Sequence, residues 1–231
     1  QGDDGQVLTS TGSGVAWEAA SGGATDINGL SDAKTFGTSS IMLGDATTGT
    51  IDAANYNTGL GVDVFEDLTS GDNNSAFGFF ALGNNTSGGN NTVVGAYAGS
   101  LNVDDAENTI VGYAANYPDG GSRVTAVGSQ ALNSNTASDN TAVGSLALNA
   151  TVGGANNTVV GSRAGIAVTS GSENGFFGYR AGQTTTTAAS NTVIGSYSLD
   201  NGAANTGGLN TVIGHAAGRV ITSGTRNTIL G

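Results

Sequence analysis

The chain has 231 residues, 40 of them glycine, with 37% hydrophobic and only 10% charged residues, no cysteine and a formal net charge of −12. This hydrophobic fraction excludes a disordered chain, which needs low hydrophobicity and high charge, and the missing cysteine excludes disulfides and thiolate metal sites. The acidic balance, with six scattered basic residues, excludes a nucleic-acid surface, and no apolar run approaches the ~20 residues of a membrane helix.

Residues 1–38 precede the repeats and form the first predicted domain, a connector or attachment segment. Residues 5–10 and 15–18 are two strand-like runs separated by a turn-rich segment. A Ser-Gly-Gly joint follows at residues 21–23, and residues 24–38 are expected to lead into the first coil. No signal-peptide pattern opens the chain, and because Gln1 is not an initiator methionine we expect the natural protein to start earlier.

Residues 39–231 form the second predicted domain, a shaft of about twelve coils that we expect to continue past Gly231, since that residue falls partway through a repeat. In this domain a glycine closes a short apolar run and recurs every 16 to 19 residues. Self-similarity at a short period is the signature of a solenoid. The twelve repeat glycines are Gly44, Gly61, Gly78, Gly95, Gly112, Gly128, Gly144, Gly161, Gly178, Gly195, Gly214 and Gly231.

Each repeat is predicted to place a short strand just before its glycine. The two residues ahead of the glycine are apolar, as in Val93-Val94, while Asn leads the strand in ten of twelve repeats and Thr follows it in nine. Asn favours a turn and Thr favours a strand, so stacked coils should align them in ladders. Adjacent strand residues point to opposite faces, so both faces of this strand should be covered.

The predicted fold is all-β: a repetitive β-roll or β-solenoid with about 17 residues per coil, assembled as an elongated homotrimeric fibre. Such a coil holds two short strands and their turns, around a thin interior for one large apolar residue and the small alanine three residues after the glycine. The second apolar face is then left over, and other copies of the chain are the economical cover. The sequence leaves open which apolar position faces the interior.

The repeats resemble those of phage tail fibres, above all of marine and cyanobacterial phages. They read Asn-Thr-Ala-Val-Gly-Ser-Leu-Ala-Leu at residues 140–148 and Thr-Ala-Val-Gly-Ser-Gln-Ala-Leu at residues 125–132. Residues 5–10, with Trp17 behind them, are similar to a segment found just ahead of fibre shafts. The repeats are also similar to the left-handed β-roll heads of trimeric autotransporter adhesins, whose coils are usually shorter. The resemblance implies an obligate homotrimer, a role in attachment, and a C-terminal receptor tip or chaperone that these residues do not contain.

The function expected from this resemblance is that of a non-enzymatic, structural fibre shaft of a bacteriophage tail or neck, located on the virion outside the cell and presenting host-attachment elements. The expected partners are further copies of the chain in a homotrimer, other virion tail or baseplate proteins through the N-terminal segment, and a host cell-surface glycan or protein. Neither nucleic acid nor membrane insertion is expected. The alternative is the head domain of a bacterial trimeric surface adhesin, located on the bacterial cell surface.

No catalytic, cofactor-binding or metal-binding residue is predicted. His215 follows a repeat glycine without a Ser/Asp partner pattern and is expected to be a surface turn residue. Acidic clusters at residues 3–4, 63–67 and 104–107 match no calcium-loop pattern, so solvated turns are favoured over a cation site. Aromatic residues after several repeat glycines are expected to cover the ends of the small core, with contact to host sugars as the alternative. These are Phe79, Phe80, Tyr97, Tyr113, Tyr179 and Tyr197.

The sequence does not favour two further functions, ice binding and acyl transfer by a hexapeptide-repeat enzyme. A ladder of threonines can present a flat ice-binding face, but one Thr per coil beside an Asn is also what a structural ladder gives. A hexapeptide-repeat acyltransferase would show an apolar residue every six positions, whereas here the strong signal occurs once per coil and its spacing varies from 16 to 19.

Overall fold

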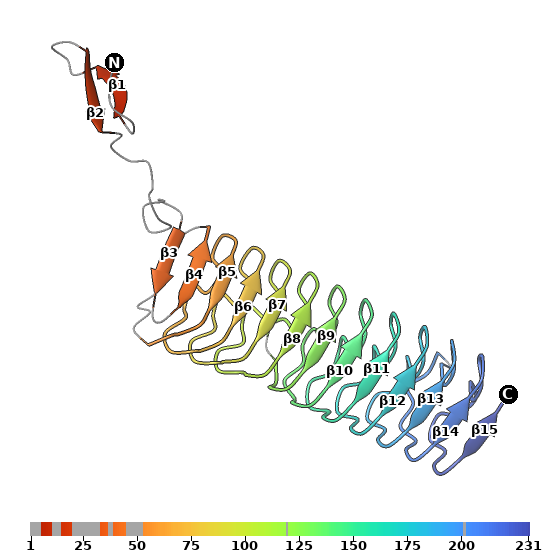
Figure 1. Ribbon diagram of the computed structural model, residues 1–231. Coiled ribbons are helices and arrows are strands. Elements are labelled where there is room, and N and C mark those ends of the chain that lie inside the picture. Colours follow the sequence, from red (N-terminus) through yellow and green to blue (C-terminus); the bar gives the residue numbers. More distant parts are fainter. Residues whose placement is uncertain are drawn as a thin grey trace.

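The computed structural model describes residues 6–10, 15–19, 33–36, 39–44, 53–118, 120–200 and 202–231. The elements of this part are strands, and from β4 onward they stack side by side along an elongated solenoid (Figure 1). The all-β solenoid predicted from the sequence is confirmed. The strands are β1 (Gln6–Ser10), β2 (Val15–Ala19), β3 (Ala33–Phe36), β4 (Ser40–Leu43), β5 (Thr58–Leu60), β6 (Ser75–Phe77), β7 (Thr92–Val94), β8 (Thr109–Val111), β9 (Thr125–Val127), β10 (Thr141–Val143), β11 (Thr158–Val160), β12 (Gly175–Phe177), β13 (Thr192–Ile194), β14 (Thr211–Ile213) and β15 (Thr228–Leu230).

The N-terminal segment contains the two strands expected there. β1 and β2 pair antiparallel, with Leu8 opposite Trp17. A third strand, β3, pairs antiparallel with β4, with Thr35 opposite Ile41, so the large sheet already begins within residues 1–38. The rest of the predicted connector lies outside the described residues.

Strands β4 to β15 form one parallel sheet in which neighbours in space are consecutive in the chain. Equivalent positions pair in register: between β7 and β8, Val93 lies opposite Ile110 and Val94 opposite Val111. Equivalent residues are 17 positions apart in most turns and 16 or 19 apart in others. The result is a solenoid of about eleven turns.

Within the described residues each coil contains one strand, and the prediction of two short strands per coil was wrong. Gly95, at the end of β7, has φ of 138°, and Tyr97 and Gly99 follow with φ of 59° and 53°. This recurring positive φ bends the chain too tightly for a second strand. The backbone on that side is satisfied between coils instead, as where the Leu82 N–H donates to the Ala98 carbonyl over 3.2 Å.

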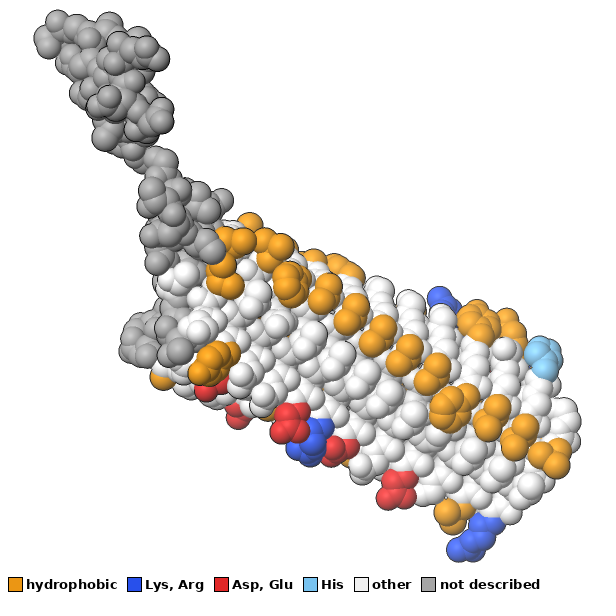
Figure 2. All heavy atoms as spheres, viewed as in Figure 1, with side chains coloured by type: hydrophobic (Ala, Val, Ile, Leu, Met, Phe, Trp, Pro, Cys, Tyr) orange, Lys and Arg blue, Asp and Glu red, His pale blue; other side chains and the backbone are white. Residues whose placement is uncertain are grey.

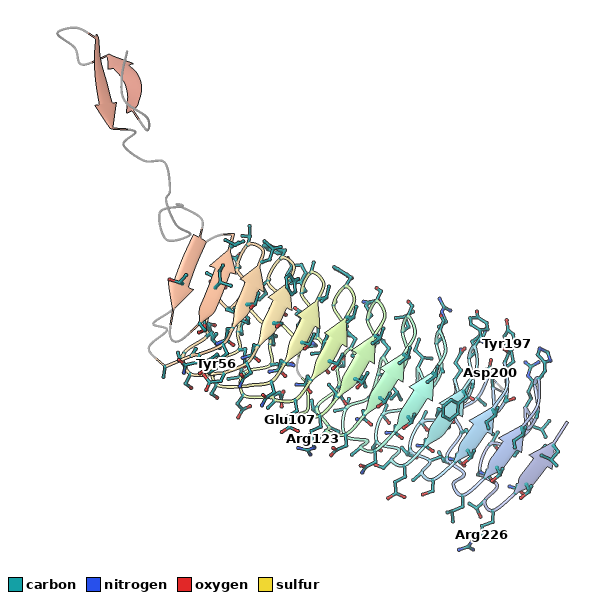
Figure 3. The ribbon with its side chains drawn as sticks, in the orientation of Figure 1. Tyr56, Glu107, Arg123, Tyr197, Asp200 and Arg226 are labelled. Carbon is teal, nitrogen blue, oxygen red and sulfur yellow. The ribbon has the colours of Figure 1, made fainter. Side chains whose placement is uncertain are left out.

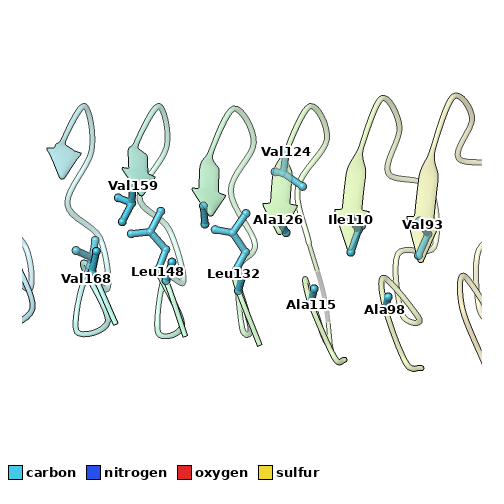
Figure 4. Close-up of a cluster of buried hydrophobic side chains, with 14 of the residues drawn as sticks. Val93, Ala98, Ile110, Ala115, Val124, Ala126, Leu132, Leu148, Val159 and Val168 are labelled. Atoms are coloured by element: carbon cyan, nitrogen blue, oxygen red, sulfur yellow. The ribbon is translucent and has the colours of Figure 1, made fainter. Parts of the chain in front are cut away.

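The hydrophobic core is a thin column that runs through the coils. The first of the two apolar strand residues points inward: Val93 and Ile110 are fully buried, whereas Val94, the second, is 40% exposed. The alanine three residues after the repeat glycine is also buried, as at Ala98, so its predicted place in the coil interior is confirmed. Figure 4 shows these side chains meeting across the interior of each coil. The structure thus decides which apolar position faces inward.

A second interior position, absent from the sequence-based prediction, lies four residues after the repeat glycine. Leu148 fills it where the strand residue is the small Ala142, and both are fully buried. Gly182 fills it where the strand residue is Phe176, and a Cβ on Gly182 would lie 2.7 Å from the Phe176 ring. The two positions are therefore complementary in size in these coils, which keeps the thin core filled without voids.

Buried asparagines at one corner of each coil form the predicted ladder. The Asn174 backbone N–H and side-chain Nδ2 both donate to Oδ1 of Asn157, each over 3.0 Å, and Nδ2 also donates to the Ala188 carbonyl over 2.9 Å. Each such buried hydrogen bond contributes about 1 kcal/mol net. Val124 interrupts the ladder: its backbone N–H still donates to Oδ1 of Asn108 over 2.9 Å, but it has no side-chain amide to add the second hydrogen bond.

Candidate interaction surfaces

The second apolar residue of each strand faces outward, and together these residues form what we call the outer strip. In Figure 2 its side chains run as a row along the solenoid. Ten of the twelve are 36% to 72% exposed in the single chain, and Val127 and Val143 are half-buried. The strip consists of Leu43, Leu60, Phe77, Val94, Val111, Val127, Val143, Val160, Phe177, Ile194, Ile213 and Leu230.

The surroundings of the outer strip are uncharged. Two residues before it on most strands lies a threonine on the same face, such as Thr92 or Thr158, and both of these are exposed. In Figure 2 the charged side chains lie toward the margins of the visible face, away from the row. Contiguous apolar surface of this extent on a soluble chain marks an interaction site. The residues range in size from Val to Phe, so the face is uneven, which does not suit a flat ice lattice.

A second candidate surface lies at the edge where the chain turns after each strand. Phe79, Phe80, Tyr97, Tyr113 and Tyr117 form what we call the first aromatic cluster. The centroid of the Tyr97 ring lies 5.1 Å from that of Phe79, 6.4 Å from that of Tyr113 and 6.3 Å from that of Tyr117. A cavity of about 310 Å³ is lined by Tyr97, Tyr113, Ala114 and Tyr117.

The second aromatic cluster lies nearer the C-terminus on the same edge and comprises Tyr179, Arg180, Tyr197 and His215. Its rings contact each other edge to face, with centroids 5.3 Å apart for Tyr179 and Tyr197 and 6.0 Å apart for Tyr197 and His215. The Arg180 guanidinium lies over the Tyr197 ring, 5.1 Å from its centroid. Arg180 Nε is also 3.1 Å from Oδ2 of the buried Asp200, an ion pair in which this N–H is not aimed at the carboxylate.

The other residues weighed in the sequence occupy surface positions. His215 is exposed, and its described partner is the Tyr197 ring. Asp67 accepts a hydrogen bond from Asn84 over 2.9 Å, and Asp105 accepts one from Ser122 over 3.3 Å, so both carboxylates join neighbouring coils. Among the described residues, His, Asp and Glu side chains form no group of three placed to hold a metal ion; residues 3–4 lie outside them.

One exposed ion pair has a resolved electrostatic effect. Arg123 donates to both carboxylate oxygens of Asp139, over 2.7 Å from Nε and 2.9 Å from Nη2. The hydrogen bond from Arg123, followed by its charge, lowers the pKa of Asp139. In turn, the hydrogen bond to Asp139 and the charge of Asp139 raise the pKa of Arg123. Because both side chains are exposed, the pair contributes little to stability.

The basic residues are distributed less evenly than the sequence analysis assumed. Residues 1–160 contain 16 acidic and two basic residues, whereas residues 161–231 contain two acidic and four basic ones. The first aromatic cluster therefore belongs to the acidic part of the shaft and the second to the part that is weakly basic. Because the two parts of the shaft differ in the sign of their net charge, their long-range attraction for charged ligands differs.

In comparisons with known proteins, no family model, curated protein or solved structure matches the chain. The part of the chain that the structure describes has no helix that is both long and apolar enough to span a membrane.

Proposed function

We propose that the chain is the shaft of a homotrimeric fibre, a structural element of a bacteriophage tail or neck that holds host-attachment elements away from the virion. The observation that carries this proposal is the outer strip, an apolar face that runs the length of the described solenoid and is not covered by the described residues of the single chain. Three copies around a common axis would bury all three strips against one another, which is a closed and symmetric arrangement.

The size of the strip supports this assembly energetically. Complete burial of a Val, Leu, Ile or Phe side chain stabilises by about 1.5–3 kcal/mol, and a typical strip residue such as Val94 is still 40% exposed. Burying this remainder is worth about 0.5–1 kcal/mol per residue, or about 6–12 kcal/mol over the strip. Association costs about 4–15 kcal/mol, so the whole strip is needed, and a break in its middle should prevent assembly.

The experiment that tests the assembly places a charge in the middle of the strip. Val143→Asp puts a carboxylate on the outer face of β10. In a trimer the carboxylates of the three copies would be buried together without a partner of opposite charge. In a monomer the same residue remains half-exposed and is tolerated. We expect light scattering to show a folded monomer for this variant. The matched control is Val152→Asp, since Val152 is 54% exposed in a return loop away from the strip. A Val143→Asp variant that keeps the assembled mass contradicts the proposal.

The second candidate function is the head of a bacterial trimeric surface adhesin, and the coil-corner Asn ladder and the outer strip fit it equally. The position of the chain in its genome separates the two. A neighbouring tail gene supports the fibre, and a downstream coiled-coil stalk with a membrane anchor supports the adhesin. Localisation to the virion or to the bacterial surface follows the same division.

A further inference from the structure

We propose that the cavity of the first aromatic cluster is a binding site for a quaternary ammonium group, such as that of choline. The cavity is lined by the rings of Tyr97, Tyr113 and Tyr117 together with Ala114. Its volume of about 310 Å³ lies at the small end of ligand-sized pockets. A cation within about 6 Å of an aromatic ring centroid is attracted by the electron-rich ring face, and several rings around one cation add their attraction.

The orientation of the rings distinguishes a site in which several rings surround a cation from a flat aromatic surface on which a sugar stacks. The Tyr97 ring is inclined by 89° to that of Tyr113 and by 68° to that of Tyr117. Rings at such angles do not form the flat surface on which a sugar ring stacks, and they line a partly open pocket. Among the described residues, the side chains of the lining offer tyrosine hydroxyls and none of the amide, carboxylate and guanidinium groups that fix sugar hydroxyls.

The second aromatic cluster supplies a precedent within the same chain. Tyr197 lies two residues after its repeat glycine, as Tyr97 does, and it already carries a cation, the Arg180 guanidinium 5.1 Å from its ring centroid. Arg180 occupies the coil position that Phe80 holds in the first cluster. An equivalent tyrosine at this edge therefore contacts a cation in one cluster, whereas in the other cluster Phe80 holds the place of that cation and the cavity lies between the three tyrosines of that cluster.

The net negative charge of the part of the solenoid that contains the first cluster favours a cationic ligand over an anionic one, although Figure 3 shows Glu107 on the opposite edge from Tyr197. Residues 53–160 contain nine acidic residues against one basic residue, Arg123. A negative surface raises the local concentration of cations and repels anions. Small volume, a tyrosine lining and the net negative charge of this part of the solenoid together favour a small, weakly hydrated cation.

The test uses the full chain with 3-fluorotyrosine at its six tyrosines, followed by fluorine NMR during titration with tetramethylammonium and with choline. We expect the signals of Tyr97, Tyr113 and Tyr117, assigned by single Tyr→Phe variants, to shift with saturation. Tyr113→Ala should weaken choline binding at least tenfold, and Tyr113→Phe should retain binding within about threefold. Tyr56→Ala is the matched control, because Tyr56 is 56% exposed against 57% for Tyr113. Figure 3 shows Tyr56 on the opposite edge from Tyr197.

Three outcomes would overturn the proposal. The first is an equal response to 3,3-dimethylbutan-1-ol, the uncharged analogue of choline, because a cation-selective site must discriminate against it. The second is a response to a neutral pyranose in place of choline. The third is no saturable shift at all with either cation. Cosedimentation with phosphatidylcholine vesicles then assigns the source of the group: binding to vesicles indicates a lipid headgroup, and binding of choline alone indicates a free solute.

This inference goes beyond the proposed shaft function and does not depend on it, because all the lining residues belong to one chain. A chain that binds choline as a monomer would contradict the fibre and leave the site standing. A trimer without choline binding would do the reverse.

Discussion

Replacing Phe176 by alanine should remove one of the largest side chains from the core of a single coil. Phe176 is fully buried, and the facing position holds Gly182, which has no side chain to move into the space. Truncation of a buried Phe to Ala costs about 3–5 kcal/mol, and the cost rises as the site fails to collapse. We therefore expect a loss near the upper end of this range, about 4–5 kcal/mol.

The same coil offers a compensating change. Other coils pair a small strand residue with a leucine, as Ala142 does with Leu148, so Phe176→Ala combined with Gly182→Leu reproduces an arrangement that the chain already uses. The backbone permits this, because Gly182 has φ of 61° and Leu148 adopts 49°. Burial of the new leucine should restore about 1.5–3 kcal/mol. Gly182→Leu alone should destabilise by about 1–3 kcal/mol, since its Cβ already lies 2.7 Å from the Phe176 ring.

The assay is thermal and urea unfolding of the four chains, followed by circular dichroism at equal protomer concentration, since assembly shifts apparent stability by mass action. The double variant should be more stable than Phe176→Ala, although each single change destabilises. Residues in contact show such coupling, whereas independent sites add. If the two losses simply add in the double variant, the size-complementary core is refuted.

Three further predictions concern the remaining contacts between coils. Gly161→Ala should lower stability by at least about 3 kcal/mol, because φ there is 142° and the new Cβ would lie 2.2 Å from the Gly178 carbonyl oxygen. The control is Gly153→Ala, because Gly153 has open space around it. Equal melting temperatures for the two variants would count against this packing. Val124→Asn should fill the gap in the Asn ladder and raise stability by about 1 kcal/mol, as measured by urea unfolding, whereas a loss would show that the ladder adds nothing at this coil. The lowered pKa of Asp139 gives a small stabilisation that is present above the ordinary Asp pKa and is lost as the pH falls through the lowered folded value. Below about pH 4, the melting temperature should therefore fall slightly less for Asp139→Asn than for the natural chain. Identical pH profiles would show that the ion pair does not affect stability.

The sequence predicted the coil because its strongest physical constraints are local and repeated. Asn, Thr, two apolar residues and Gly specify a corner, a strand and a positive φ, and in-register stacking follows from their fixed spacing. The inward and outward positions could not be told apart, because Val93 and Val94 are equally apolar and only the direction of the chain after the glycine decides between them.

The second strand was predicted wrongly because the segment after the glycine contains residues, such as Tyr97 and Leu148, that rarely adopt positive φ. The size pairing of Phe176 with Gly182 is visible in the sequence once the position four residues after the glycine is aligned, and it would have identified the core. The sequence singled out Phe79, Phe80, Tyr97 and Tyr113 as aromatic residues after repeat glycines, but it did not predict that their rings contact one another. Tyr117 was missed, because it lies beyond the residues that directly follow the glycine, and the turn brings it back against Tyr97.

The most direct test of the fibre is the mass of the unmodified chain in solution, measured by light scattering without denaturant. If two further copies of the chain cover the outer strip, the measured mass will be about three times 22.5 kDa. A monodisperse species of 22.5 kDa, with the strip exposed to water, would contradict the proposed assembly.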